Sequence, residues 1–209
     1  MVSAALLQRY RERGVKYWKP IQTGIEQDDD TAEVRRLSTC GADQVLNAGV
    51  RLPRPVSPHL AAKLNGSPID IEALVGIAEG QTGPWIVEGA GGVLVPLNEQ
   101  VLLIDLIRRL QQPALPVLIV ARSGLGTINH TLLTLEALNR RAVPVAGVVM
   151  VGTADDLGRE NRFAIERHGS VPVVGELPTL DPLTPETLGQ WAEASLDREG
   201  CLMEWLGSG

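Results

Sequence analysis

WIVEGAGG, residues 85–92, places three apolar residues directly before one carboxylate and four small residues. An apolar strand that runs into a glycine-rich turn is typical of an α/β fold, because small side chains let a ligand approach the backbone. Similar apolar runs cover residues 116–121, 143–151 and 171–174, and segments with helical spacing lie between them. Continuous apolar strands that alternate with helices predict a mostly parallel sheet covered by helices on both faces.

Helices are expected where apolar residues recur at helical spacing, and turns where glycine, proline or clustered polar residues interrupt that spacing. The expected helices after the first cover residues 31–38, 59–64, 69–79, 102–110, 128–140, 156–168 and 187–206. A short strand is expected over residues 15–18 and a polar loop over residues 21–30. Three prolines make residues 46–58 an extended or irregular segment.

Composition narrows the class of protein. The 209 residues are 44% hydrophobic, which suits one α/β domain over residues 1–209, with two small domains as the alternative. A net charge of −6 gives no basic field, so we expect no nucleic acid and no anionic membrane as a partner. Cys40 and Cys201 lie far apart without a CxxC spacing, which argues against a disulfide framework and a zinc site. No apolar run is long enough for a membrane span and no signal peptide is visible, so we expect a cytoplasmic protein.

The chain opens inside a helix that begins at Val2 and that Gly14 ends. A βαβ sheet needs a strand before its first helix, and in phosphate-binding domains that strand leads into a glycine-rich loop with the pattern GxxxxGK[ST]. The pattern is absent, because the lysines are Lys16, Lys19 and Lys63 and none follows a glycine. We therefore expect the first strand and its phosphate loop to be missing.

KPIQTG, residues 19–24, follows the short strand over residues 15–18. A lysine at a strand end can neutralise a phosphate or carbamate oxygen, and Thr23 can donate a hydrogen bond to a substrate. The alternative is that Lys19 is an exposed lysine before a proline that stops a helix.

Two acidic positions suit a divalent cation. Asp28, Asp29 and Asp30 precede a short helix, where they either complement the helix dipole or provide a carboxylate ligand to Mg²⁺. Glu88 follows an apolar strand and precedes four small residues, which suits a Mg²⁺ ligand beside an anion-binding loop. The alternative for Glu88 is a solvated side chain in a glycine-rich turn.

Three further stretches carry weaker signals. Ser57-Pro58-His59 fits a plain helix N-cap, and neither His59 nor His130 has the spacing of a metal ligand. Residues 124–130 open the helix expected over residues 128–140, whose free N–H groups suit a carboxylate or a phosphate, although a plain capped helix start is the alternative. Residues 178–180 lie in a loop after the last strand.

The order of these motifs resembles the dethiobiotin synthetase family. KPIQTG, the acidic cluster, VSPH, VEGAGG, SGLGTINHTLLTLEAL and VGELP follow one another as in that family, and the resemblance is strongest at residues 15–24 and 84–152. It implies a P-loop NTPase-like α/β fold, a homodimer, and a cyclo-ligase reaction. In that reaction the ureido ring of dethiobiotin is closed from 7,8-diaminononanoate and CO₂ with ATP and Mg²⁺, a step of biotin biosynthesis.

The resemblance also implies roles for individual residues. Lys19 corresponds to the catalytic lysine and Thr23 to a substrate-binding hydroxyl, while Asp30 and Glu88 correspond to the Mg²⁺ ligands. Nucleotide-binding positions correspond to Asp30, Glu88, Gly89, Ala90, Gly91, Pro178, Thr179 and Leu180. The helix start that receives the substrate's tail carboxylate across the dimer corresponds to Gly126, Thr127, Ile128 and Asn129.

The sequence departs from the family in two places. The phosphate loop is not found, so we expect these 209 residues alone to bind ATP weakly and turn over slowly. Val151 stands where family members often have an asparagine that reads adenine, and valine cannot hydrogen-bond a base. The alternatives are another ATP-dependent ligase of the P-loop class and a non-catalytic descendant that binds a carboxylate or a partner subunit.

Overall fold

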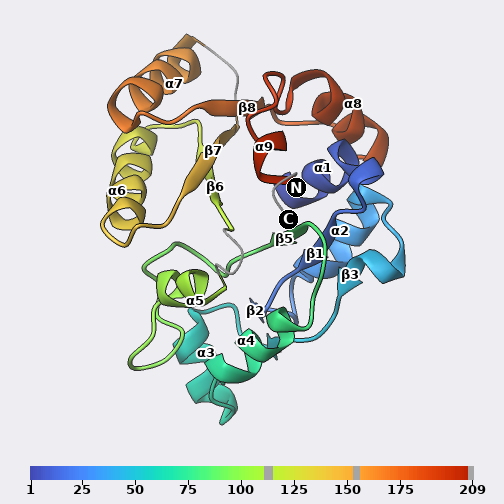
Figure 1. The fold of residues 1–209 in the computed structure, drawn as a ribbon, viewed down its shortest axis with the longest axis vertical. Coiled ribbons are helices and arrows are strands. Elements are labelled where there is room, and N and C mark those ends of the chain that lie inside the picture. Colours follow the sequence, from blue (N-terminus) through green and yellow to red (C-terminus); the bar gives the residue numbers. More distant parts are fainter. Residues whose placement is uncertain (111–114, 153–155, 207–209) are drawn as a thin grey trace.

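Helices and parallel strands alternate along the chain in the computed structural model, which describes residues 1–110, 115–152 and 156–206 (Figure 1). The strands are β1 (Lys16–Trp18), β2 (Ile21–Thr23), β3 (Val45–Leu46), β4 (Val50–Leu52), β5 (Trp85–Val87), β6 (Val117–Arg122), β7 (Val145–Val151) and β8 (Val173–Leu177). The helices are α1 (Val2–Arg9), α2 (Asp30–Ser38), α3 (Pro58–Asn65), α4 (Ile71–Glu79), α5 (Leu103–Arg109), α6 (Thr127–Asn139), α7 (Asp156–Gly169), α8 (Pro185–Ser195) and α9 (Met203–Leu206). Short 3-10 helices cover Arg11–Arg13 and Ala42–Gln44. The predicted α/β class is confirmed.

Within these residues the strands form the parallel groups β3-β1-β5, β2-β4 and β6-β7-β8. Tyr17 lies opposite Ile86, and Trp18 lies opposite Val87. In the described part of the chain, one edge of β5 and one edge of β6 pair with no further strand. The single sheet that the apolar runs suggested is therefore divided, although every one of these strand pairs is parallel as predicted.

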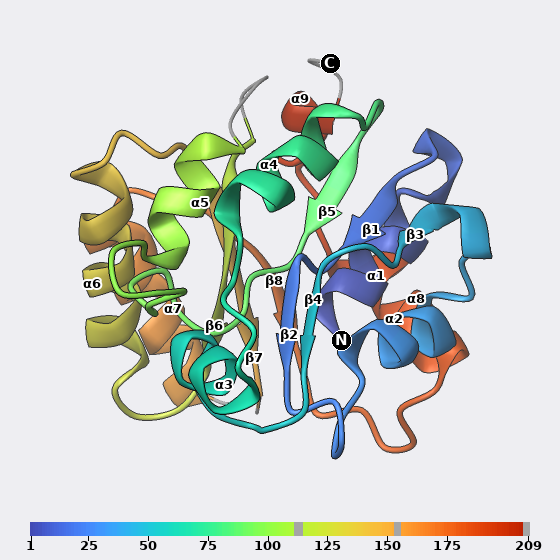
Figure 2. The same cartoon turned by 90° about the horizontal axis from the view of Figure 1, so that it is seen from below.

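Helices cover the sheets in two groups. Helix α1 packs against α2, α8 and the β1–β5 sheet, whereas α6 packs against α7 and β6. Figure 2 shows α6 and α7 at one end of the molecule and α2 and α8 at the other. No helix in the described ranges is both long enough and apolar enough to cross a membrane.

The apolar core follows the two faces of β1. Tyr17 belongs to a buried cluster with residues of α1, α8, β7 and β8. Trp18 points to the opposite face and belongs to a second cluster with residues of α3, α4 and α5. This division follows from the alternation of side chains along a strand. A third cluster joins α5 to β6, α6 and β7.

Short strands form in one segment predicted as a polar loop and in one predicted as extended or irregular. Residues 21–23, predicted as part of a polar loop, form β2, and residues 50–52 form β4 and pair with β2 in parallel. Three-residue strands are too short to show a periodicity, and their pairing depends on distant residues. The prediction of a polar loop was therefore wrong at residues 21–23, whereas the strand at residues 50–52 agrees with the predicted extended structure.

The predicted C-terminal helix over residues 187–206 was also wrong in its extent. Helix α8 ends at Ser195, and α9 begins only at Met203. Between them Asp197 adopts a φ of +53° and is buried. Its carboxylate accepts hydrogen bonds from the Tyr10 hydroxyl (2.5 Å) and the Leu202 N–H (3.1 Å), and these tertiary contacts interrupt the helix.

Candidate active site

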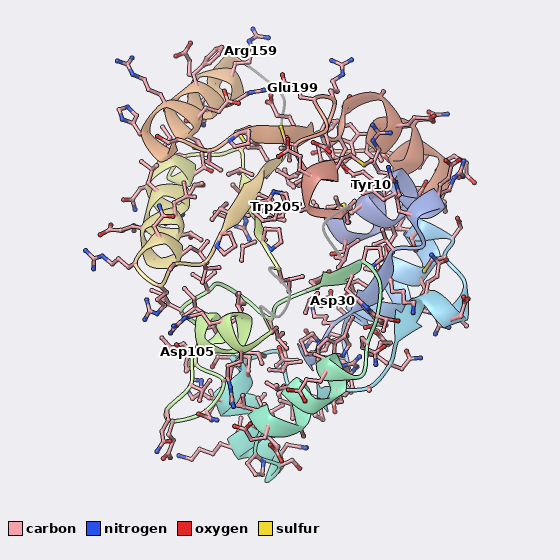
Figure 3. The ribbon with its side chains drawn as sticks, viewed as in Figure 1. Tyr10, Asp30, Asp105, Arg159, Glu199 and Trp205 are labelled. Atoms are coloured by element: carbon pink, nitrogen blue, oxygen red, sulfur yellow. The ribbon has the colours of Figure 1, made fainter. Side chains whose placement is uncertain are left out.

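Lys19 lies between two carboxylates at the end of β1. Its Nζ contacts Glu88 Oε1 at 2.8 Å and also forms an ion pair with Asp30, which is labelled in Figure 3. Glu88 follows β5, and its N–H donates to the carbonyl of Trp18 at 2.8 Å, so the strand pairing brings the two residues together. Asp30 begins α2. Lys19 is only 6% exposed, which excludes the alternative of a solvated lysine.

Lys19 and Glu88 hold each other in the charged form. Burial alone would lower the pKa of Lys19, but Glu88 and Asp30 outweigh burial and the pKa is raised. Burial would raise the pKa of Glu88, but Lys19 and a hydrogen bond from Ser3 outweigh it and the pKa is lowered. The formal charges of one lysine and two carboxylates give these three side chains a net charge of −1.

A buried amide fixes the acidic loop that presents Asp30. Gln22 is 0% exposed, and its Nε2 donates to the carbonyl of Asp28 (3.3 Å) and to Asp29 Oδ1 (3.2 Å). Its Oε1 accepts a hydrogen bond from Thr31 at 3.2 Å. Asp29 caps α2 by accepting the Ala32 N–H at 3.0 Å, and this bond is the main reason why its pKa is lowered. The helix-dipole interpretation is thus right for Asp29, whereas Asp30 faces Lys19.

A cavity of about 290 Å³ adjoins Lys19. The residues that line it are Lys19, Thr23, Asp30, Val56, Ser57, Pro58, Ala90, Gly91 and Val95. Charged and hydroxyl groups thus share the cavity with aliphatic side chains. Ser57 occupies the N-cap position of α3 but makes no capping hydrogen bond, so its hydroxyl is not committed to the helix.

Packing accounts for part of the glycine-rich loop. A Cβ on Gly89 would lie 2.9 Å from a methyl carbon of Leu103, and Gly91 has a φ of +82°. Both constraints favour glycine in this loop whether or not a ligand binds, and the one at Gly91 comes from the backbone itself. Ala90 and Gly91 nevertheless line the cavity, whereas Gly89 does not.

The start of α6 lies outside this cavity. Gly126 is the N-cap with a φ of +92°, no side chain caps the helix, and the first turn holds no acidic residue. The hydroxyl of Thr127 is buried without a hydrogen-bond partner. Val95 lines the first cavity and also a second one, on the side of Leu133 and Thr134 of α6. The predicted anion site at Gly126–Asn129 is therefore a separate feature, with an unsatisfied polar atom of its own.

The remaining predicted residues do not line the Lys19 cavity. Pro178, Thr179 and Leu180 follow β8, and Leu180 packs against the cluster that contains Tyr17. Within the described ranges, no group of three or more histidine, cysteine, aspartate or glutamate side chains could hold a metal ion. Asp30 and Glu88 are the paired carboxylates that the site offers.

The sequence patterns gave no role at this site to three of its polar residues, and they indicated only a helix cap for a fourth, Ser57. Tyr17 and Ser3 donate to Glu88, Gln22 fixes the acidic loop, and Ser57 lines the cavity. Tyr17 had one usable signal, because residues two apart on a strand point to the same side and Tyr17 lies two before Lys19. Ser3 and Gln22 depend on contacts between elements, which no local pattern reports.

Comparison with known proteins first defines the class. A family model described as an AAA domain matches residues 1–187. The MinC:MinD cell division protein complex of Aquifex aeolicus is similar in fold, with a TM-score of 0.55 at 12% identity over 99% of this chain and 88% of that chain. Together with the parallel strands and flanking helices, these findings define an α/β fold of the P-loop NTPase type.

Curated relatives then define the family. An ATP-dependent dethiobiotin synthetase of Paramagnetospirillum magneticum is 48% identical over 188 residues, covering 90% of this chain and 85% of that protein. One from Agrobacterium fabrum is 45% identical over 174 residues, covering 83% and 78%. A biotin biosynthesis bifunctional protein of Bordetella avium is 42% identical over 92% of this chain and 39% of that protein. The chain belongs to the ATP-dependent dethiobiotin synthetase family.

Proposed function

We propose that this chain closes the ureido ring of dethiobiotin from 7,8-diaminononanoate and CO₂, using ATP and Mg²⁺. The observation that carries the proposal is Lys19, a buried lysine held in its charged form at the wall of a partly aliphatic cavity. Family membership supports the proposal, because curated relatives at 45–48% identity are named for ATP-dependent dethiobiotin synthesis.

The reaction suits a site without a side-chain nucleophile. One amine of the substrate adds to CO₂ and loses a proton, and the resulting carbamate oxygen accepts the γ-phosphoryl group of ATP. The second amine then attacks the carbamoyl carbon, closes the ring and releases phosphate. Negative charge accumulates on oxygen in these steps, and the ammonium group of Lys19 stabilises that charge. Thr23 lines the same cavity, and in this proposal its hydroxyl donates a hydrogen bond to the substrate.

The carboxylates of Asp30 and Glu88 fit a magnesium ion. Mg²⁺ prefers hard oxygen ligands, often one or two carboxylates together with phosphate oxygens. The net charge of −1 on Lys19, Asp30 and Glu88 attracts a cation and leaves Lys19 charged. We propose that Asp30 and Glu88 hold the ion, which when bound neutralises phosphate charge. Glu88 to Gly91 and Pro178 to Leu180 are the proposed nucleotide contacts.

The aliphatic part of the substrate has a matching surface. Val56, Pro58 and Val95 line one cavity with Lys19 and suit a hydrocarbon chain. The uncapped start of α6, with the unpartnered Thr127 hydroxyl, suits a carboxylate. Because this start does not line the Lys19 cavity, we propose a homodimer in which α6 of the second copy receives the tail carboxylate.

An assay of dethiobiotin formation tests the proposal. Purified chain is incubated with diaminononanoate, bicarbonate, ATP and Mg²⁺, and the product is detected by mass spectrometry. We expect slow formation that Lys19→Ala reduces on the order of 100-fold, as for removal of one donor to a developing oxyanion. Lys63→Ala is the control, because Lys63 is an exposed lysine on α3. No product from the unaltered chain, or equal activity of Lys19→Ala, would overturn the proposal.

A further inference from the structure

The carboxylate of Glu88 accepts hydrogen bonds from two hydroxyl groups that the proposed chemistry does not use. Tyr17 is 0% exposed, and its hydroxyl donates to Glu88 Oε2 at 3.2 Å. Ser3, in the first turn of α1, donates to the same oxygen. Lys19 contacts the other oxygen, Oε1, at 2.8 Å. The two oxygens of one carboxylate therefore have different environments, one facing the core and one facing Lys19.

The strand pairing explains why Tyr17 reaches Glu88. Tyr17 lies opposite Ile86, and Glu88 is two residues beyond Ile86, so all three side chains fall on one side of the β1–β5 pair. The ring of Tyr17 fills the core beneath α1, and its hydroxyl extends to the carboxylate at the strand end. A phenylalanine would fill the same space without donating a hydrogen bond.

A second buried tyrosine provides a comparison. Tyr10 donates to Asp197 at 2.5 Å, but Asp197 also accepts the backbone N–H of Leu202 and so fixes the chain between α8 and α9. Glu88 differs, because its carboxylate partners in the described ranges are the side chains of Ser3, Tyr17 and Lys19. Its carboxylate holds no loop together, so the bonds from Tyr17 and Ser3 orient the carboxylate itself.

We propose that Tyr17 is a positioning residue that, together with Ser3, holds Oε2 of Glu88 and leaves Oε1 for a divalent cation. This inference rests on the proposed role of Glu88 as a magnesium ligand. Outer hydrogen bonds to a ligating carboxylate fix its orientation, and their loss typically weakens metal binding roughly 10- to 100-fold. The substitution Tyr17→Phe removes one such bond and keeps the ring.

The test measures binding of Mn²⁺, a stand-in for Mg²⁺, to the full chain by electron paramagnetic resonance of the free ion. We expect Tyr17→Phe to weaken Mn²⁺ binding roughly tenfold, at the lower end of outer-ligand effects. Tyr10→Phe is the matched control, because it removes the hydroxyl of the other buried tyrosine–carboxylate pair, and it should bind Mn²⁺ as the unaltered chain does. Ser3→Ala tests the same oxygen from α1 if Tyr17→Phe does not fold, and should also weaken binding.

Glu88→Gln separates the two proposals. If Glu88→Gln weakens Mn²⁺ binding but Tyr17→Phe and Ser3→Ala do not, the positioning role is wrong and the ligand role of Glu88 stands. If Glu88→Gln leaves binding unchanged, or if the unaltered chain binds no Mn²⁺, the proposed ligand role fails and the positioning role fails with it. Equal weakening by Tyr10→Phe and Tyr17→Phe would also overturn the inference, because it would reflect general destabilisation.

Discussion

The phenol groups of Tyr10 and Tyr17 both have strongly raised pKa values. Burial raises the pKa of each far above its ordinary value of 10.0, and the hydrogen-bonded carboxylates, Asp197 and Glu88, raise it further. These are the only tyrosines in the chain. Neither phenol should ionise in the native protein under conditions where an unfolded tyrosine does.

This difference predicts a loss of stability in alkali. Above 10.0, the ordinary pKa, an unfolded tyrosine releases its proton while the native one keeps it, so stability falls as pH rises toward the native pKa. Urea unfolding between about pH 8 and pH 11 should show this decline, and Tyr10→Phe should make it shallower. Absorbance of phenolate at 295 nm should appear only with unfolding. Phenolate that forms while the protein is still folded would contradict the prediction.

The sequence identified the charged residues of the site but not its buried amide, Gln22. Charged residues at the ends of strands and helices can be recognised from the sequence alone, and this is how Lys19, Asp30 and Glu88 were predicted. The structure brings the three side chains into contact. Gln22 was not predicted, although it is fully buried and fixes the acidic loop. A buried amide is recognisable only by its partners, and those partners come from the fold.

Helix starts differ in whether their first residue is used for capping. Asp70, before α4, accepts the Ala73 N–H at 3.0 Å, whereas Ser57, before α3, makes no capping bond and lines the cavity. The sequence predicted Ser57 as a plain helix cap, because serine followed by proline is common there. The structure agrees on its position but leaves its hydroxyl available to a ligand.

Substitution of these two residues should separate stability from function. Asp70→Ala should cost about 1 kcal/mol of stability by loss of the cap, with little effect on substrate affinity. Ser57→Ala should cost much less stability but raise KM for the diamino acid. Urea unfolding and steady-state kinetics on both variants would measure this. A cap-sized stability loss in Ser57→Ala with unchanged KM would show that Ser57 is only a helix cap.

A second effect at the level of elements concerns the acidic loop. Gln22→Leu would keep a similar volume but remove the donors to Asp28 and Asp29 and the acceptor for Thr31. A buried hydroxyl left without a partner costs about 1–3 kcal/mol. We expect a lower urea midpoint together with weaker Mn²⁺ binding, because Asp30 is no longer held beside Lys19. Unchanged Mn²⁺ binding at a lower midpoint would limit Gln22 to stability.

At the scale of the molecule, the parallel α/β architecture was predictable because long apolar runs and amphipathic helices alternate in the chain. The division of the strands into separate parallel groups was less predictable. Short strands such as β2 and β4 carry no periodic signal, and which edges remain unpaired depends on the complete set of strands. The break between α8 and α9 also required the distant contact from Tyr10 to Asp197.

Among the residues that the structure describes, one edge of β6 pairs with no further strand, and this edge predicts self-association. Val120 on that strand is 56% exposed, and an exposed apolar edge strand is a template for pairing with another chain. Val120→Lys should suppress species larger than a dimer, because a charged edge disfavours strand pairing. Phe163→Lys is the control, because Phe163 is 61% exposed on a helix, α7, and the change in charge is the same. Sedimentation velocity over a range of concentrations would compare them, and an equal effect of both substitutions would show that general hydrophobicity, not the strand edge, drives association.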